Sequence, residues 1–243
     1  EEDEALRPEL DDGPDRRRHD EESREEPPVL AEAAVDPQQL RHGMLDQARQ
    51  RARELNQRGA LFPWRTISGE EAGAYYAAGT AQYHINAAII YALRKYVLAT
   101  GDEEFLERCG AEMLVETARL WVDLGFYSPR QGGKFCINAV TGPDEYNTVV
   151  NNNAYTNLMA RENLRYAVRT VHALRATKPE AYAALVYKTA LDDAEVDAWT
   201  RAADSMFVPY DEALQIIPQD DNFLDGEPWD FKNTPEDRYP LLL

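Results

Sequence analysis

The sequence predicts an all-α fold for the region that begins near residue 37. Apolar residues recur there at spacings of three and four, the period of an amphipathic helix. Strand-like runs are short by comparison. Of the 243 residues, 44% are hydrophobic and 10% aromatic, which is enough apolar material for a sizeable core. We therefore expect a helical domain whose loops carry the function.

The first 36 residues differ in composition from the rest of the chain. Between Glu1 and Pro27 there are 13 acidic residues and 5 arginines. Apolar residues are few and show no periodicity, so this stretch cannot bury enough surface to offset the entropy of ordering. We predict an acidic disordered tail over residues 1–36 and a folded domain over residues 37–243.

Three helices are predicted in the first half of the domain. Roughly Pro37–Asn56 forms the first, and Arg58-Gly59 marks its end. Ala81–Thr100 forms the second, which is apolar around much of its surface and is expected to be buried. Gly101-Asp102 ends that helix and caps the third, Glu103–Leu124. The apolar positions of the first helix are Leu40, Met44, Leu45, Ala48, Ala52 and Leu55.

The second half begins with a glycine-rich bend, Gly125–Gly133, and a short strand-like run, Lys134–Val140. Thr141–Asn153 is polar and irregular. From Phe207 onward the chain is rich in Pro, Asp and aromatic residues and is predicted to be loop. Three further helices are predicted between these segments, over Ala154–Arg175, Pro179–Lys188 and Asp192–Met206.

Charge and composition exclude several classes of protein. Asp and Glu outnumber Lys and Arg by 44 to 26, a net charge of −18. General nucleic-acid binding needs clustered basic residues and is therefore not expected. No run approaches the ~20 apolar residues of a membrane span, and no secretory signal is visible. The sequence predicts neither a nucleic-acid partner nor a membrane partner.

Cysteine and histidine usage favours a reducing compartment. Cys109 and Cys136 are too few for a disulfide framework, so we expect a cytoplasmic protein whose thiols serve packing. The histidines lack the spacing of metal ligands, and no metal site is predicted. They stand at His19, His42, His84 and His172.

One segment, Thr141-Gly142-Pro143-Asp144-Glu145-Tyr146, is the strongest candidate for chemistry. Gly-Pro forces a bend, and two adjacent carboxylates follow it. If both are desolvated, one of them can retain a proton near neutral pH. A protonated carboxyl is what a general acid for glycosidic cleavage requires. Taken alone, such a loop is more often a turn with solvated acids.

Three polar and aromatic segments strengthen the carbohydrate interpretation, because amides bind sugar hydroxyls and aromatic rings stack on sugars. One runs from Phe62 to Tyr76, a second covers Gln82 to Asn86, and a third is the Asn151–Asn157 run. The alternative for the third is a helix N-cap, and one of its asparagines is expected to do only that. The candidate substrate contacts are Trp64, Arg65, Glu71, Tyr75, Tyr76, Gln82, His84, Asp144, Tyr146, Asn152 and Asn153.

Four ordered motifs resemble glycoside hydrolase family 65. They are Leu61–Thr66 with Gly69–Glu71, then Gly79–Asn86, then Thr141–Tyr146 with Asn152–Asn157, and finally Pro218–Leu224 with Trp229–Phe231. The resemblance extends from about Leu40 to Leu243.

The resemblance implies an (α/α)6-barrel catalytic domain and an inverting phosphorylase of α-linked glucose disaccharides. By resemblance Glu145 is the general acid, and inorganic phosphate is a co-substrate, with no bound cofactor. The products would be β-glucose 1-phosphate and glucose, from a disaccharide of the trehalose or kojibiose type, or from maltose. Because phosphate replaces the water and base of an inverting hydrolase, one protein carboxylate suffices for proton transfer. Relatives often dimerise, so a homodimer is among the expected partners.

Departures from the family pattern leave alternatives open. The predicted helices make about half of a barrel, and the family's upstream Trp-Asp pair has no counterpart. Ala88 and Asn151 stand where many relatives have Asp. We expect the chain to be the central piece of a larger enzyme, with the phosphate-gripping residues beyond Leu243. The alternatives are an inactive truncated remnant and a family hydrolase that uses water.

Overall fold

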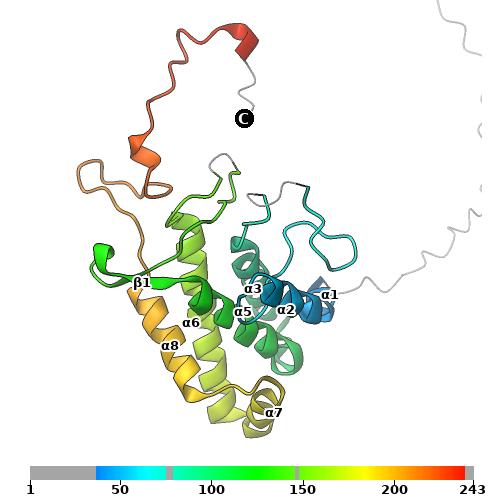
Figure 1. Cartoon of the computed structure of the whole chain (residues 1–243). Coiled ribbons are helices and arrows are strands. Elements are labelled where there is room, and N and C mark those ends of the chain that lie inside the picture. Colours follow the sequence, from blue (N-terminus) through cyan, green and yellow to red (C-terminus); the bar gives the residue numbers. More distant parts are fainter. Residues whose placement is uncertain (1–36, 75–78, 146–147, 239–243) are drawn as a thin grey trace, which may run out of the picture. The chain divides into compact units, whose positions relative to one another are not determined.

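A computed structural model of the chain describes residues 37–74, 79–145 and 148–238 (Figure 1). They belong to the compact unit Val35–Leu243, and the predicted acidic tail lies outside the described residues. As predicted, the described chain is mostly helical. Its longer helices are α1 (Pro37–Gly43), α2 (Leu45–Glu54), α3 (His84–Thr100), α5 (Ala111–Leu124), α6 (Ala154–Thr177), α7 (Pro179–Thr189) and α8 (Asp193–Ser205).

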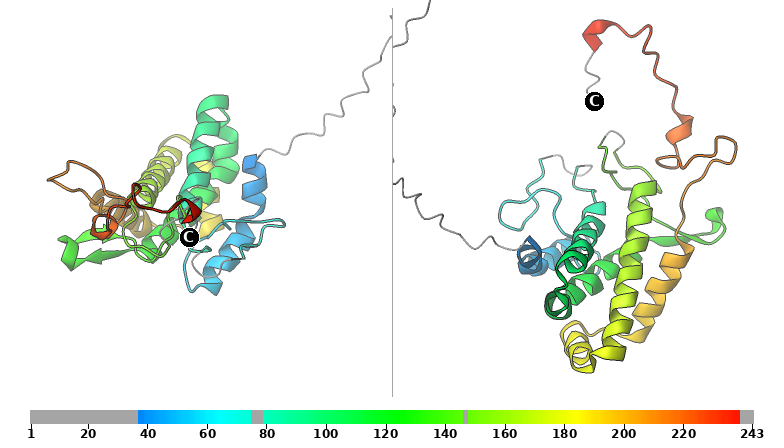
Figure 2. Two further views of the ribbon diagram at one scale, coloured as in Figure 1. Left: turned by 90° about the horizontal axis from the view of Figure 1, so that it is seen from above. Right: turned by 180° about the vertical axis from the view of Figure 1, so that it is seen from behind.

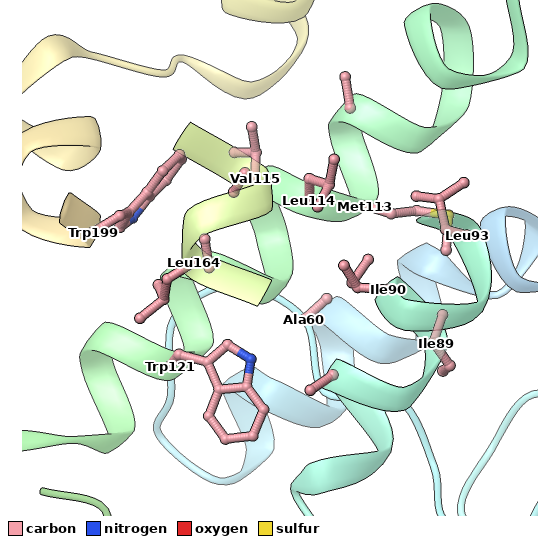
Figure 3. Packing of buried hydrophobic residues seen from close by; sticks show 14 of the residues in the cluster. Ala60, Ile89, Ile90, Leu93, Met113, Leu114, Val115, Trp121, Leu164 and Trp199 are labelled. Carbon is pink, nitrogen blue, oxygen red and sulfur yellow. The ribbon is translucent and has the colours of Figure 1, made fainter. Parts of the chain in front are cut away.

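The helix α6 lies at the centre of the packing. It contacts α3 and α5 and runs beside α8, as Figure 1 and the rear view of Figure 2 show. Between these helices lies a hydrophobic core in which Trp121 of α5 and Trp199 of α8 are fully buried (Figure 3). The Trp121 indole donates a hydrogen bond from Nε1 to Oδ1 of Asn163 at 2.9 Å. This pairing lets a polar group sit in the core without the penalty of a missing partner.

Helix boundaries follow the capping residues that the sequence predicts. Gly101 ends α3 with φ of 71°, a left-handed conformation that suits glycine. Asp102 then caps the short α4 (Glu103–Phe105), where its Oδ1 accepts from the Phe105 N–H at 2.9 Å. The predicted ends of α6, α7 and α8 agree with the structure to within two residues.

Three helix predictions need correction. The predicted helix over 37–56 is broken at Met44, which has φ of −91° and ψ of 1° and follows the poor helix former Gly43. The helix α3 begins at His84, three residues after the predicted start, because Ala81 pairs with another segment. Its carbonyl accepts from the Thr141 N–H at 3.0 Å. The predicted helix over 103–124 is interrupted by a π-helical turn, η1 (Leu106–Gly110).

The predicted bend at 125–133 contains a strand that sequence analysis missed. The strand β1 (Phe126–Ser128) pairs antiparallel with β2 (Lys134–Cys136), and the 3₁₀ turn η2 (Pro129–Gln131) connects them. The strand-like run predicted to reach Val140 ends at Cys136. Pairing between two strands is a non-local property, so a three-residue strand leaves little periodic signal.

The prediction that α3 is buried on nearly all sides is also wrong. Ile90 and Leu93 face the core, but the side chain of Tyr91 is 50% exposed and that of Leu98 is 70% exposed. Both cysteines are free, as expected, and burial raises the pKa of each thiol. Cys136 is buried and Cys109 partly so, in agreement with a packing role.

The loops that precede α3 and α6 lie at the same end of the helices (Figures 1 and 2). These loops carry residues 61–74 and 79–83 before α3, and 137–153 before α6. Among the described helices, none has the length and apolarity that a membrane span requires. The fold therefore gathers the candidate motifs at one end of its helical scaffold.

Candidate active site

The loop that carries Glu145 is held at several points. The Glu145 N–H donates to the Gly142 carbonyl at 3.2 Å, and Asp144 accepts a hydrogen bond from the Gln219 amide. A Cβ on Gly142 would lie 2.7 Å from Nδ2 of Asn153, so a larger residue there would displace the Asn153 side chain. Glu145 itself has φ of +60°, an uncommon and strained backbone conformation for a non-glycine residue. Such strain occurs preferentially at functional sites.

The Glu145 carboxylate meets a residue from the segment before α3. The Nε2 of Gln82 donates to Oε1 of Glu145 at 2.9 Å, and Gln82 is buried. The structure therefore joins two of the sequence motifs, which lie 63 residues apart in the chain.

His84 is the first residue of α3 and interacts with Glu145 electrostatically. Burial lowers the pKa of His84 from 6.5, although a hydrogen bond with the Thr141 backbone and the charge of Glu145 act in the opposite direction. The ring is therefore neutral near pH 7. Its edge contacts Tyr155, with the ring centroids 5.9 Å apart.

Desolvation of both neighbouring carboxylates, the condition on which one of them would retain a proton, is not met in the described chain. Glu145 is exposed and Asp144 is partly buried within the described chain. In the structure the motif turns Glu145 outward, and Asp144 instead binds Gln219.

The paired asparagines before α6 have structural roles. The structure identifies Asn153 as the asparagine that caps α6, and its Oδ1 accepts from the backbone N–H and the hydroxyl of Thr156, both at 2.9 Å. Asn152 donates to Oδ2 of Asp221 at 2.8 Å. Asn157, one turn further along, donates to the Phe207 carbonyl at 2.9 Å. Both proposed sugar contacts, Asn152 and Asn153, thus use their amides to fix the loops of the site.

Glu71 likewise organises its own loop. Its carboxylate accepts from the backbone N–H groups of Trp64 at 2.8 Å and Gly73 at 2.9 Å. Arg51 of α2 forms an ion pair with it at 3.0 Å and also donates to the Phe62 carbonyl at 2.8 Å. Arg51 was missed in the sequence because it reads as one more charged residue on an amphipathic helix.

Trp64 and Arg65 stack on each other in the same loop, with the guanidinium carbon 4.0 Å from the indole centroid. Arg65 is exposed and Trp64 is partly buried, so both retain surface for a ligand. Tyr75, Tyr76 and Tyr146 lie outside the described residues. Within the described chain, no group of three or more His, Cys, Asp or Glu side chains is arranged to hold a metal ion.

Gln219 is a site residue that the sequence did not single out. Besides its bond to Asp144, its carbonyl accepts from the Ala154 N–H at 2.8 Å and from Asn153 Nδ2 at 3.3 Å. The segment around Gln219 therefore closes the site from the C-terminal side. The only signal for it was its place in the Pro218–Leu224 motif.

Comparison with known proteins decides the family. The sequence profile described as "Glycosyl hydrolase family 65 central catalytic domain" matches residues 28–243. The chain belongs to glycosyl hydrolase family 65.

Several curated relatives share this segment. An α,α-trehalose phosphorylase of Thermoanaerobacter brockii is 54% identical over 216 residues, which is 89% of this chain and 28% of the relative. That of Geobacillus stearothermophilus is 55% identical over 84% of this chain and 26% of its own length. A maltose phosphorylase of Bacillus subtilis is 34% identical over 77% of this chain and 24% of its own length. The chain thus spans about a quarter of the length of these relatives.

The fold of this family 65 chain also matches a solved structure. A protein named "Putative kojibiose phosphorylase from human microbiome" superposes with a TM-score of 0.73 at 29% identity, covering 83% of this chain and 27% of the other. The helical architecture and this likeness agree with the predicted partial (α/α)6 barrel.

Proposed function

We propose that this chain supplies the acid-bearing part of an inverting phosphorylase for an α-linked glucose disaccharide, with trehalose as the first candidate. The observation that carries this proposal is the placement of Glu145, which is exposed to solvent and accepts a hydrogen bond from Gln82 at 2.9 Å. Trehalose is favoured because identity is 54–55% to the trehalose phosphorylases and 32–34% to the maltose and kojibiose phosphorylases.

In the proposed reaction Glu145 donates its proton to the glycosidic oxygen. A phosphate oxygen attacks the anomeric carbon from the opposite face, and the bond from that carbon to the glycosidic oxygen breaks. Glucose leaves with the proton, and β-glucose 1-phosphate is formed with inverted configuration. One carboxyl is enough because phosphate is itself the nucleophile.

The test grafts residues 28–243 into the trehalose phosphorylase of Thermoanaerobacter brockii in place of the matching segment. In that graft, Glu145→Gln is expected to lower turnover of trehalose with phosphate by about 10²–10⁴-fold while the KM stays nearly constant. Asp144→Asn is the matched control and is expected to have a smaller effect, since Asp144 holds the loop. Near-normal release of glucose 1-phosphate by Glu145→Gln contradicts the proposed acid.

A further inference from the structure

Gln82 connects the acid loop to the base of α3. Its side chain is only 3% exposed, and its Nε2 donates to Oε1 of Glu145 at 2.9 Å. Beside it, the Ala81 carbonyl accepts from the Thr141 N–H at 3.0 Å. The two segments are therefore joined by the backbone and by a side chain at adjacent positions.

We infer that Gln82 is a positioning residue for Glu145, rather than a sugar ligand. This inference rests on the proposed function of Glu145. The amide of Gln82 occupies Oε1 of Glu145 as a hydrogen-bond donor. An acidic proton on that same oxygen would face an N–H group, so the proton belongs on Oε2. Gln82 thus decides which oxygen of the general acid carries the proton and turns that oxygen toward the ligand.

An exposed glutamate needs such a partner. A free glutamate side chain rotates about three bonds and spends most of its time away from the reactive geometry. Gln82 is already immobilised by burial, so it can restrain Glu145 without much further loss of its own entropy. Placing a catalytic group correctly is worth a large share of a barrier, and a misplacement of about 1 Å can cost about 100-fold in rate.

The two possible roles of Gln82 differ in which reaction they affect. A sugar ligand contributes to every reaction of the bound glucosyl unit. A positioning residue for the acid matters only where the leaving group needs a proton. With α-glucosyl fluoride, phosphate attacks the anomeric carbon and the carbon–fluorine bond breaks. Fluoride then leaves without taking a proton from Glu145.

The experiment compares trehalose and α-glucosyl fluoride as donors to phosphate in the graft described above. Gln82→Met keeps the side-chain length but removes the amide donor. We expect kcat for trehalose to fall about 10- to 100-fold. The KM for trehalose and the turnover of α-glucosyl fluoride are expected to stay within about threefold of the parent graft. Gln50→Met is the matched control, because Gln50 also donates to a glutamate, Glu54 at 2.9 Å, but on the exposed face of α2.

A second variant guards against a folding defect. Gln82→Glu preserves the shape of the side chain but places a carboxylate against Glu145, and it is expected to show the same loss with trehalose only. NMR spectroscopy of the 243-residue chain tests the contact directly. The Gln82 side-chain amide resonances should shift in Glu145→Ala and remain unchanged in Glu104→Ala.

The outcomes separate the inference from the proposed function. If Gln82→Met lowers both reactions together, or raises KM with kcat unchanged, Gln82 is a sugar ligand and the inference is overturned. The inference is also overturned if the Gln82 side-chain amide resonances do not shift in Glu145→Ala. If Glu145→Gln itself keeps its turnover of trehalose, the proposed function fails, whatever the behaviour of Gln82.

Discussion

Glu112 on α5 is the centre of a buried ionic network, and its neutralisation tests whether this network stabilises the fold. Its side chain is 3% exposed, and it accepts hydrogen bonds from Arg49 at 2.6 Å and from His42 at 3.1 Å, and a further one from Lys188. The network therefore connects α5 to α1, α2 and α7. Replacing the Glu112 carboxylate by a neutral amide removes the negative charge that pairs with these three donors and leaves one acceptor oxygen in place of two.

The contribution of Glu112 to the free energy of folding follows from the pKa of its carboxylate. Burial raises the pKa of Glu112, but the hydrogen bonds from His42, Lys188 and Arg49 outweigh this effect and hold it at about 2, below the ordinary value of 4.5. This difference corresponds to roughly 3 kcal/mol of folding free energy. A lowered pKa means that the contribution is complete above about pH 5 and is lost as the pH falls toward 2.

We therefore expect Glu112→Gln to lower the free energy of unfolding by about 2–4 kcal/mol at pH 7. The decrease in the free energy of unfolding is limited because Arg49 keeps an ion pair with Glu116 at 3.0 Å. Urea denaturation followed by circular dichroism at pH 7, 5, 4 and 3 measures the effect. The difference between wild type and variant should shrink as the pH falls.

The matched control for this series is Glu104→Gln. Glu104 pairs with Arg108 at 3.5 Å, but its side chain is 79% exposed. Its replacement is expected to change the free energy of unfolding by less than about 0.5 kcal/mol. A difference between wild type and Glu112→Gln that stays constant from pH 7 to pH 3 would refute the reasoning, because the lost stability would then not depend on the carboxylate's charge.

Three further stability predictions concern buried polar groups and backbone strain, and denaturant titration measures each. Asn86→Leu should lower the free energy of unfolding by roughly 2–4 kcal/mol, since Asn86 accepts from the Phe62 N–H at 2.9 Å and donates to the Ala60 carbonyl at 2.7 Å. A loss below about 1 kcal/mol would mean that water replaces these bonds. Trp121→Phe should lower the free energy of unfolding by roughly 2–3 kcal/mol because it leaves a cavity and an unpaired Asn163 oxygen. An unchanged free energy of unfolding would contradict this prediction. Val149→Asn should stabilise by roughly 0.5–1 kcal/mol, because Val149 has φ of +60° and asparagine tolerates this conformation better; a destabilised variant would show that the valine packs usefully.

Much of the fold could be predicted from the sequence because helices are encoded locally. The periodicity of apolar residues located α6, α7 and α8, and Gly101-Asp102 marked the junction after α3. The predictions were wrong where a non-local contact overrides a local pattern. The strand β1 exists only because β2 lies beside it, and α3 begins late because Ala81 pairs with Thr141.

The candidate site likewise has features that the sequence predicts and features that it does not. Its motifs could be found in the sequence because four short segments occur in the order typical of glycosyl hydrolase family 65. The hydrogen-bond partners of the individual polar residues could not be predicted. A sequence motif does not show whether an amide or carboxylate in it binds a ligand or another part of the protein. Glu71 and Asn153 were predicted to contact sugar. In the structure Glu71 accepts from the backbone of its own loop, and Asn153 caps the first turn of α6.

By itself, then, the sequence determined that the chain is helical, where most helices end and which family's motifs it carries. Each of these depends on residues within a few positions of one another. Only the tertiary structure decided that Gln82 meets Glu145 and that Arg49 meets Glu112, in both cases across 63 residues of chain. The physical reason is that hydrogen bonds and ion pairs act over about 3 Å, so their partners are chosen by which helix faces and loops pack together.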